Sequence, residues 1–367
     1  MNFLDRIVRQ ALRTTIPEFV SRVEPFSISL EEYDLAISGH HFSVYSPSFS
    51  PYCHYIAKEK QLIIQSNSYL TSFVADCILA WHCDFAWRDS LMRYNLKKFF
   101  AEQILAVSDI AIGRSLLMET LLFEEPEMVA AYAKYNDSPE LQGLVEAAKA
   151  IAHDILVKHE LAHVLQKSLP QFSDHLMKDL PPHCEGEDWG SLDKRIRENL
   201  EADALATQGA WSLDLPFPAK KKLELIRLVH ALLAAMNILA KCACRTVEMN
   251  PSQEEEDIRN NFFEPMSGAS YFIAILPEYD RRGRSAVRVA SAMAARDGVD
   301  ASDGAPDVLT EVYRHMLDLM GGDTSSYRAK CEMLGHALYG NPKGVQFLQL
   351  RSKRFPTIAT TSHPTRQ

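Results

Sequence analysis

The chain has 367 residues, a formal net charge of -9 and a pI near 5.8. Hydrophobic residues make up 47% and charged residues 24% of it, which is typical of globular proteins and excludes a disordered or fibrous chain. The length predicts two or three lobes, and the acidic balance argues against a nucleic-acid partner because phosphate binding needs an excess of Lys and Arg.

Residues 1–135 are expected to form an N-terminal helical region with a small sheet. Residues 1–23 mix charged and apolar positions at helical spacing, which favours an amphipathic helix over a secretory signal. A small sheet is predicted between residues 26 and 66, where FSVYSP and KQLIIQS are rich in β-branched and aromatic residues. From residue 69 to Pro126 the pattern predicts two long helices, one over TSFVADCILAWHCDFAW and one over LKKFF to LLF.

Residues 136–295 are expected to form a central region. One helix of about eight turns is predicted over residues 138–169, because Ser138 can cap it, Pro139 suits its first position and Pro170 ends it. A loop over 171–191 then lets a second helix, DKRIRENLEADALATQGAW, return beside the first.

Further helices are predicted over KKLELIRLVHALLAAMNILAKCACRTV, SAVRVASAMAAR and DVLTEVYRHMLDLM. Residues 305–353 are expected to be a C-terminal helical region and 354–367 a flexible tail. The predicted fold class is therefore mainly α with a small β element.

Two compositional features bear on location. The most hydrophobic window, Leu228 to Ala240, has about 13 residues and is predicted to be a buried core helix, too short to cross a membrane. This excludes the classes of enzyme that are built from several membrane-spanning helices. The seven cysteines are odd in number and form no pair of CxxC motifs, which favours reduced thiols in the cytoplasm.

The motif HELAH, residues 159–163, indicates a metal site. His159 and His163 are four apart, so on a helix they differ by about 40° in direction and about 6 Å in height, and both rings can reach one zinc ion. Glu160 is suited to act as general base on water at that ion. In a chain of this composition the pattern is expected by chance roughly 0.03 times, so the sequence predicts a Zn²⁺-dependent peptidase.

Catalytic zinc takes three protein ligands, and the third must come from elsewhere in the chain. The segment ENLEADALA on the next predicted helix offers acidic and amide side chains at a suitable distance along the chain, namely Glu198, Asn199, Glu201 and Asp203.

The HELAH motif followed by an Ala-Asp pair on a later helix resembles the gluzincin metallopeptidases, which implies a zincin-like core around the HELAH helix. In several such families the ligand Glu lies four residues before that Asp. Asp203 sets this position at Asn199, so the chain departs from the pattern. The ligand role is then left to Glu201 or Glu198, which share a helix face, and Glu201 is the first choice.

A peptidase also needs a donor for the oxyanion that forms on the attacked carbonyl. Gluzincins commonly supply a Tyr, His or Arg from beyond the third ligand, and here the segment LPEYDRRGRSAVR offers Tyr279 and Arg288 as first choices. The other helix histidines, His153 and His230, are interpreted as core or surface residues.

The layout of the first 290 residues or so is similar to that of the bacterial phage-exclusion (Lit-type) peptidases. It shares a mixed N-terminal region, a strand like KQLIIQS leading into a helix with Trp and Cys, and HExxH near residue 160. The resemblance implies a protease that an activating phage partner switches on and that then cleaves a host translation elongation factor.

Two other functions are compatible with the sequence. One is a catalytically silent metal-binding sensor or interaction protein, because Asn199 stands where a ligand is expected. The other is a peptidase that cleaves repressors of mobile elements. The acidic balance and the lack of a basic helix-turn-helix pattern count against the second.

Overall fold

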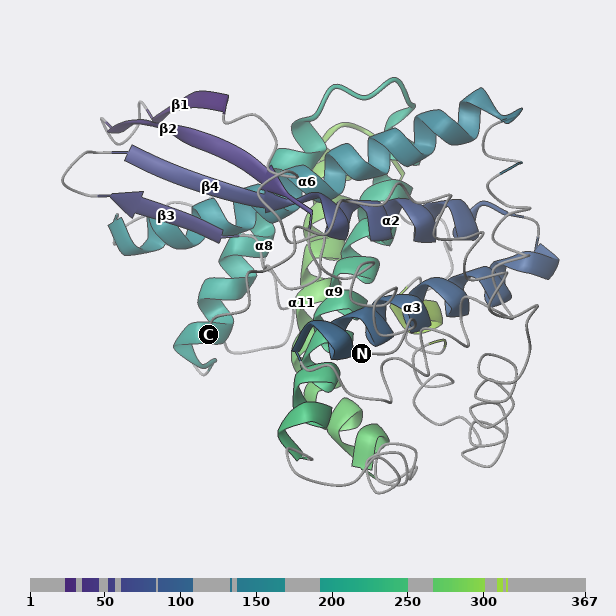
Figure 1. The fold of residues 1–367 in the computed structure, drawn as a ribbon. Helices are drawn as coiled ribbons and strands as arrows, with labels where there is room; N and C mark the ends of the chain where they lie inside the picture. The colour runs from purple at the N-terminus through teal and green to yellow at the C-terminus, as the bar shows by residue number, and fades with distance from the viewer. Residues whose placement is uncertain are drawn as a thin grey trace, which may run out of the picture.

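The computed structural model describes residues 24–30, 35–45, 52–56, 61–83, 85–107, 133, 137–168, 192–249, 267–300, 309–312 and 315. In this part of the chain the fold is mainly α with a small sheet, as predicted (Figure 1). The expected opening helix (1–23), the expected tail (354–367) and most of the expected C-terminal region (305–353) lie outside the described residues.

The sheet has four strands in the order β1-β2-β4-β3. Its strands are β1 (Glu24–Leu30), β2 (Leu35–Val44), β3 (Tyr52–Ile56) and β4 (Gln61–Asn67). The central pair, β2 and β4, is parallel, with His41 opposite Ile64, and both edge strands are antiparallel to their neighbours. The sheet predicted between residues 26 and 66 is therefore confirmed.

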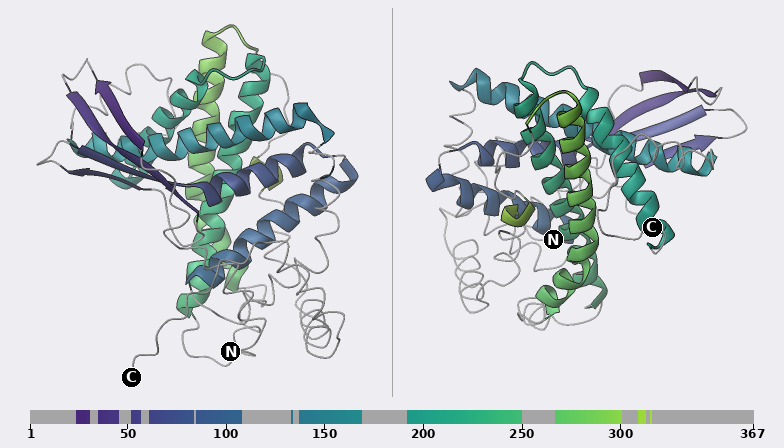
Figure 2. Two further views of the ribbon diagram at one scale, coloured as in Figure 1. Left: turned by 45° about the horizontal axis from the view of Figure 1, so that its top comes forward. Right: turned by 180° about the vertical axis from the view of Figure 1, so that it is seen from behind.

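Six long helices account for most of the described chain. They are α2 (Ser68–Trp81), α3 (Phe85–Val107), α6 (Pro139–Ser168), α8 (Lys194–Ser212), α9 (Ala219–Met249) and α11 (Ser267–Arg296). Figure 2 shows α9 and α11 side by side, running across the direction of α2, α3 and α6. The sheet lies at one end of α6, where β3 and β4 contact that helix.

Local signals explain where several helices begin and end. The Ser138 hydroxyl accepts a hydrogen bond from the Leu141 amide at 3.3 Å, which confirms the predicted cap of α6. The Asn67 side chain caps α2 through the Tyr69 amide. The helix predicted to run through residue 87 instead ends at Trp81, where His82 leaves the helical backbone conformation and the next amide, of Cys83, bonds to Ala80 at 3.2 Å.

The largest difference from the prediction is the extent of α11. The sequence predicts a helix over residues 285–296, and the prediction does not extend to the preceding segment, which contains Pro277 and Gly283. The structure has one helix from Ser267 to Arg296 that includes both residues. It packs against α8 and α9, and this tertiary packing outweighs the low helix propensity of proline and glycine.

A single hydrophobic cluster connects α2, α3, α6, α9 and α11. Among the described residues its most enclosed side chains include Phe99, Phe100 and Ile151. The apolar stretch of α9 is longer than the 13-residue window suggests: Ala219–Ala243 is long and apolar enough to cross a membrane, with mean hydropathy 1.7. However, 78% of its apolar window is buried inside the protein, which accounts for its composition.

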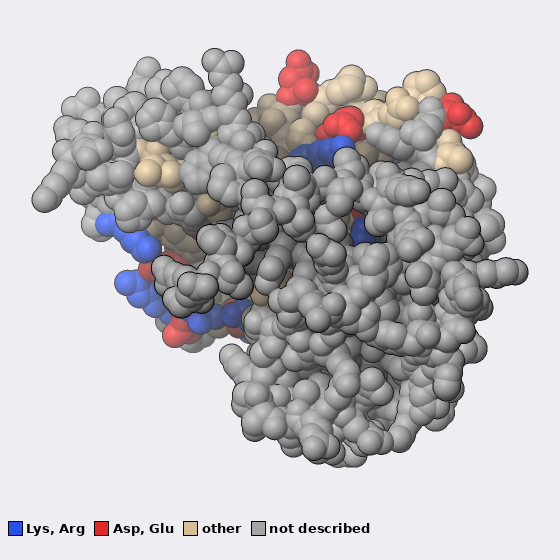
Figure 3. All heavy atoms as spheres, in the orientation of Figure 1, with Lys and Arg blue, Asp and Glu red and all other residues tan. Residues whose placement is uncertain are grey.

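Charged side chains of both signs occur on the surface of the described residues. On the face shown in Figure 3, described Lys and Arg atoms lie beside Asp and Glu atoms near the sheet end of the molecule. Opposite charges interleaved in this way are typical of a solvated surface.

Candidate metal and active site

The candidate site lies where α6 and α8 pack together. The HELAH motif occupies the C-terminal half of α6, and the segment ENLEAD occupies the first half of α8. The two helices contact each other along their length, so the second helix returns beside the first as predicted. The predicted loop over 171–191 lies outside the described residues.

The two motif histidines converge. The Nε2 atoms of His159 and His163 lie 3.1 Å apart, and their rings meet edge to face with centroids 4.7 Å apart. This is the arrangement that spacing by one helical turn predicts.

Gln166 fixes the ring of His163. Its amide nitrogen donates to the backbone oxygen of Glu198 and to Oε2 of Glu201, both at 2.9 Å. Its Oε1 is therefore the acceptor for Nδ1 of His163, at 2.9 Å. The proton of His163 accordingly sits on Nδ1, and Nε2 carries a lone pair. Burial and the neighbouring His159 lower the pKa of His163.

Asp203 fixes the ring of His159 in the same way. Its Oδ1 lies 2.8 Å from Nδ1 of His159, so this nitrogen carries a proton, and Nε2 of the same ring faces Nε2 of His163. Asp203 also accepts two hydrogen bonds from the Arg282 guanidinium, from Nε to Oδ2 at 2.7 Å and from Nη2 to Oδ1 at 3.0 Å. Burial alone would raise the pKa of the Asp203 carboxyl. The effects of Arg282 and His159 are larger, and they hold this pKa well below its usual range.

The donor set fits a bound cation. The two Nε2 atoms face each other at 3.1 Å, a contact that either a shared proton or a bound cation between them satisfies. In a tetrahedral zinc site with Zn–N of about 2.0–2.1 Å, two ligand nitrogens lie roughly 3.3 Å apart. Because both Nδ1 protons are committed to acceptors, His159 and His163 present the ligand atoms that such a site requires.

A cavity of about 370 Å³ opens beside the two histidines. Glu160 lines it, and burial raises the pKa of this carboxyl, while His159, Arg282 and Lys167 oppose the rise. An apolar part of the lining comes from α2, α3 and α9. It includes Leu70, Phe99, Leu233, Ala234 and Met236.

The four candidates for a third ligand lie in different surroundings. Asn199 and Asp203 line the cavity with His159 and His163, whereas Glu201 and Glu198 are not among its lining residues. Glu201 is buried and accepts from Gln166, and the Glu198 carboxylate lies 3.6 Å from Lys194. Among the described residues, no Asp or Glu places an oxygen within 4.8 Å of ligand atoms of both histidines.

Of the two predicted oxyanion donors, the structure brings one to the site. Tyr279 is buried and lines the cavity, whereas Arg288 is exposed and does not. Sequence reasoning missed Arg282, which lines the cavity and holds Asp203. Arg282 lies three residues after Tyr279, so on a helix both side chains share one face. Had α11 been predicted to be helical at this point, the spacing would have placed Arg282 beside Tyr279.

His230 also lines the cavity, although the sequence suggested only a core or surface role. It is 5% exposed, and its Nε2 lies 2.9 Å from the Thr207 hydroxyl. That hydroxyl donates its proton to the backbone oxygen of Asp203 at 2.6 Å, so His230 is the donor to Thr207.

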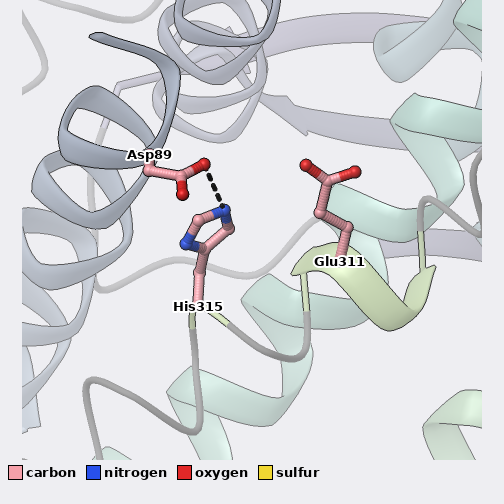
Figure 4. Close-up of side chains that lie close together, drawn as sticks. All are labelled: Asp89, Glu311 and His315. Carbon is pink, nitrogen blue, oxygen red and sulfur yellow. Dashed lines mark ion pairs between the residues drawn. The ribbon is translucent and has the colours of Figure 1, made fainter. Parts of the chain in front are cut away.

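A second group of residues with metal-ligand chemistry lies elsewhere. Asp89 of α3, Glu311 and His315 have ligand atoms within 4.8 Å of one another, and Figure 4 shows both carboxylates beside the His315 ring. Asp89 and His315 form an ion pair at 3.6 Å, and the Asp89 side chain is 47% exposed. Exposed acidic groups are common without a bound metal, so this group alone is not evidence for one.

Comparisons of the chain with protein-family models, with curated proteins and with solved structures found no match.

Proposed function

We propose that the chain is a zinc-dependent endopeptidase whose zinc is held by His159 and His163 and whose general base is Glu160. The observation that supports the proposal is the pair of Nε2 atoms converging at 3.1 Å, with the Nδ1 atoms of both rings bound to Gln166 and Asp203. The presence of Glu160 in the adjoining cavity turns a metal site into a candidate catalytic site.

The chemistry divides between the ion and the chain. When bound, Zn²⁺ polarises a carbonyl group and lowers the pKa of a water molecule. Glu160 takes a proton from the attacking water as the new C–O bond forms, and it delivers that proton to the amine as the C–N bond breaks. Burial raises the pKa of Glu160, which brings it closer to the working range of a group that must gain and lose a proton.

Tyr279 is the candidate donor to the oxyanion. It comes from α11 and lines the cavity, and the Arg282 guanidinium lies over its ring at 5.9 Å. A phenol donor in a partly enclosed cavity stabilises negative charge that develops on the carbonyl oxygen.

The gluzincin resemblance supports a zincin-like core and a protein or peptide substrate. The resemblance in layout to the phage-exclusion peptidases supports an activating partner and a role in phage defence. The cysteine pattern supports a cytoplasmic location, and the acidic balance argues against nucleic acid as a partner.

The test is Glu160→Gln in the purified full chain. We expect zinc content near that of the wild-type protein and loss of peptide-bond cleavage, measured with dye-labelled casein and with extracts of phage-infected cells. Glu140→Gln, in the exposed first turn of the same helix, is the matched control and should cleave normally. Absence of zinc from the wild-type protein, or full cleavage by Glu160→Gln, would overturn the proposal.

One observation favours a second function, a catalytically silent metal sensor. The cavity presents Asn199 rather than a carboxylate where gluzincins have their ligand Glu. In that case Glu160→Gln would leave the biological effect of the chain unchanged.

A further inference from the structure

Asn199 stands at the ligand position that the Ala-Asp pair defines. It lies four residues before Asp203 on α8, so the two side chains share one face of the helix. Asp203 already contacts His159, and both Asn199 and Asp203 line the cavity together with His159 and His163. The side chain of Asn199 is therefore presented to the same space as the two zinc ligands.

The orientation of the Asn199 amide is set by one hydrogen bond. Its Nδ2 donates to the backbone oxygen of Arg195 at 2.9 Å. This bond uses the amide nitrogen within α8 and leaves Oδ1 as the end that can accept or coordinate. A carbonyl oxygen is a metal ligand in proteins, although a neutral one.

The neighbouring carboxylates are committed to other contacts. Glu201 accepts from Gln166, which in turn orients His163. Moving Glu201 to the metal would release Gln166 and with it the His163 ring. The Glu198 carboxylate lies beside Lys194 at the surface. Neither Glu201 nor Glu198 is among the residues that line the cavity beside the two histidines.

We infer that Oδ1 of Asn199 is the third protein ligand of the metal, with Glu201 acting instead as a positioning residue through Gln166. The inference rests on the proposed function, because it assumes that His159 and His163 bind the ion. It has a physical consequence. A neutral amide in place of a carboxylate removes one negative charge, so the site binds zinc more weakly than a His-His-Glu site.

The experiment measures zinc affinity by competition with a chromophoric chelator, and Co²⁺ absorption reports on the ligands. Asn199→Ala should weaken zinc binding at least tenfold, whereas Asn199→Glu should strengthen it at least tenfold. Both substitutions should change the Co²⁺ spectrum. Glu201→Gln preserves the size of the side chain and should change the affinity less than about threefold.

Asn237→Ala is the matched control. Asn237 also lines the cavity, and its Nδ2 donates to the backbone oxygen of Leu233 at 2.9 Å, in the same pattern as Asn199 and Arg195. This variant should leave zinc affinity and the Co²⁺ spectrum unchanged. Urea unfolding of each variant separates lost ligation from lost folding.

The outcomes separate this inference from the proposed function. Zinc binding that survives Asn199→Ala but is lost in Glu201→Gln would overturn the inference and leave the peptidase proposal standing. Loss of zinc in Asn199→Ala, combined with full cleavage by Glu160→Gln, would support Asn199 as a ligand and contradict Glu160 as the general base. A wild-type chain that binds no zinc would overturn both.

Discussion

Asp203 on α8 lies 2.8 Å from Nδ1 of His159 on α6, and this contact joins the two helices across the candidate site. The carboxylate holds the proton of His159 on Nδ1 and so directs Nε2 towards His163. Since Arg282 of α11 donates two hydrogen bonds to the same carboxylate, Asp203 links α6, α8 and α11.

Asp203→Asn should weaken zinc binding about 10- to 100-fold, because the neutral amide is a poorer acceptor for His159 and leaves Arg282 without its anion. Zinc competition with a chelator measures the change. Asp280→Asn is the control, since Asp280 pairs with Arg284 on α11 in a partly exposed bridge. Equal zinc affinities of Asp203→Asn and the wild-type protein would show that Asp203 does not position His159.

Arg282→Ala should lower the free energy of unfolding by about 3–5 kcal/mol, because it leaves the buried Asp203 carboxylate without its cation. Arg288→Ala, on the same helix but exposed, should change it by less than about 0.5 kcal/mol. Urea titration monitored by circular dichroism measures both. Similar losses in the two variants would contradict this role for Arg282.

Sequence reasoning reached those parts of the site that depend on local spacing. The turn between His159 and His163 and the adjacent Glu160 follow from helical geometry alone, and the cap at Ser138 follows from local chemistry. The small sheet was also predictable, because its strands have β-branched and aromatic residues between turn signals.

The features of the site and fold that the sequence did not predict depend on packing between residues far apart in the chain. Arg282 lies 79 residues beyond its partner Asp203, and no local pattern connects the two. The rotation of α8 about its axis decides whether Asn199 or Glu201 lines the cavity, and the contacts of Gln166 set the place of Glu201. A single helix through Pro277 likewise depends on its packing against α8 and α9.

Thr207→Val should destabilise the fold by about 1–3 kcal/mol. The hydroxyl is buried, donates to the Asp203 backbone oxygen and accepts from His230, and valine of similar shape leaves that histidine donor unsatisfied. Ser212→Ala is the control, because its hydroxyl makes the same type of bond, to the Gln208 backbone oxygen, at an exposed site. Urea unfolding that fails to distinguish the two variants would contradict the role of the buried pair.

Stability should fall as the pH drops from about 6.5 towards 4, in part because of His230. Burial lowers the pKa of His230 from 6.5 to about 4, with Arg282 and His159 acting in the same direction against Asp203. Between pH 6.5 and about 4, His230 binds a proton in the unfolded chain but not in the folded chain. The contribution of His230 to the free energy of unfolding is therefore present above pH 6.5 and is lost as the pH falls. This contribution is at most about 3 kcal/mol.

His230→Gln tests that contribution, because glutamine does not titrate and can still donate to Thr207. Urea unfolding at several pH values should give a shallower decline for the variant than for the wild-type protein. The pKa of His82 is also lowered to about 4 by burial, so part of the decline should persist. Identical slopes for the two proteins would show that His230 does not supply this pH dependence.

Tyr279→Phe should lower kcat by about 10²- to 10³-fold if the Tyr279 hydroxyl stabilises the oxyanion, because that charge develops only as the carbonyl is attacked. KM and zinc content should change little, since the phenyl ring still fills the cavity wall. Arg288→Ala, exposed and away from the cavity, should leave kcat unchanged. A rise in KM with kcat preserved would instead mean that Tyr279 contributes equally to substrate and transition-state binding, and the oxyanion role would then be withdrawn.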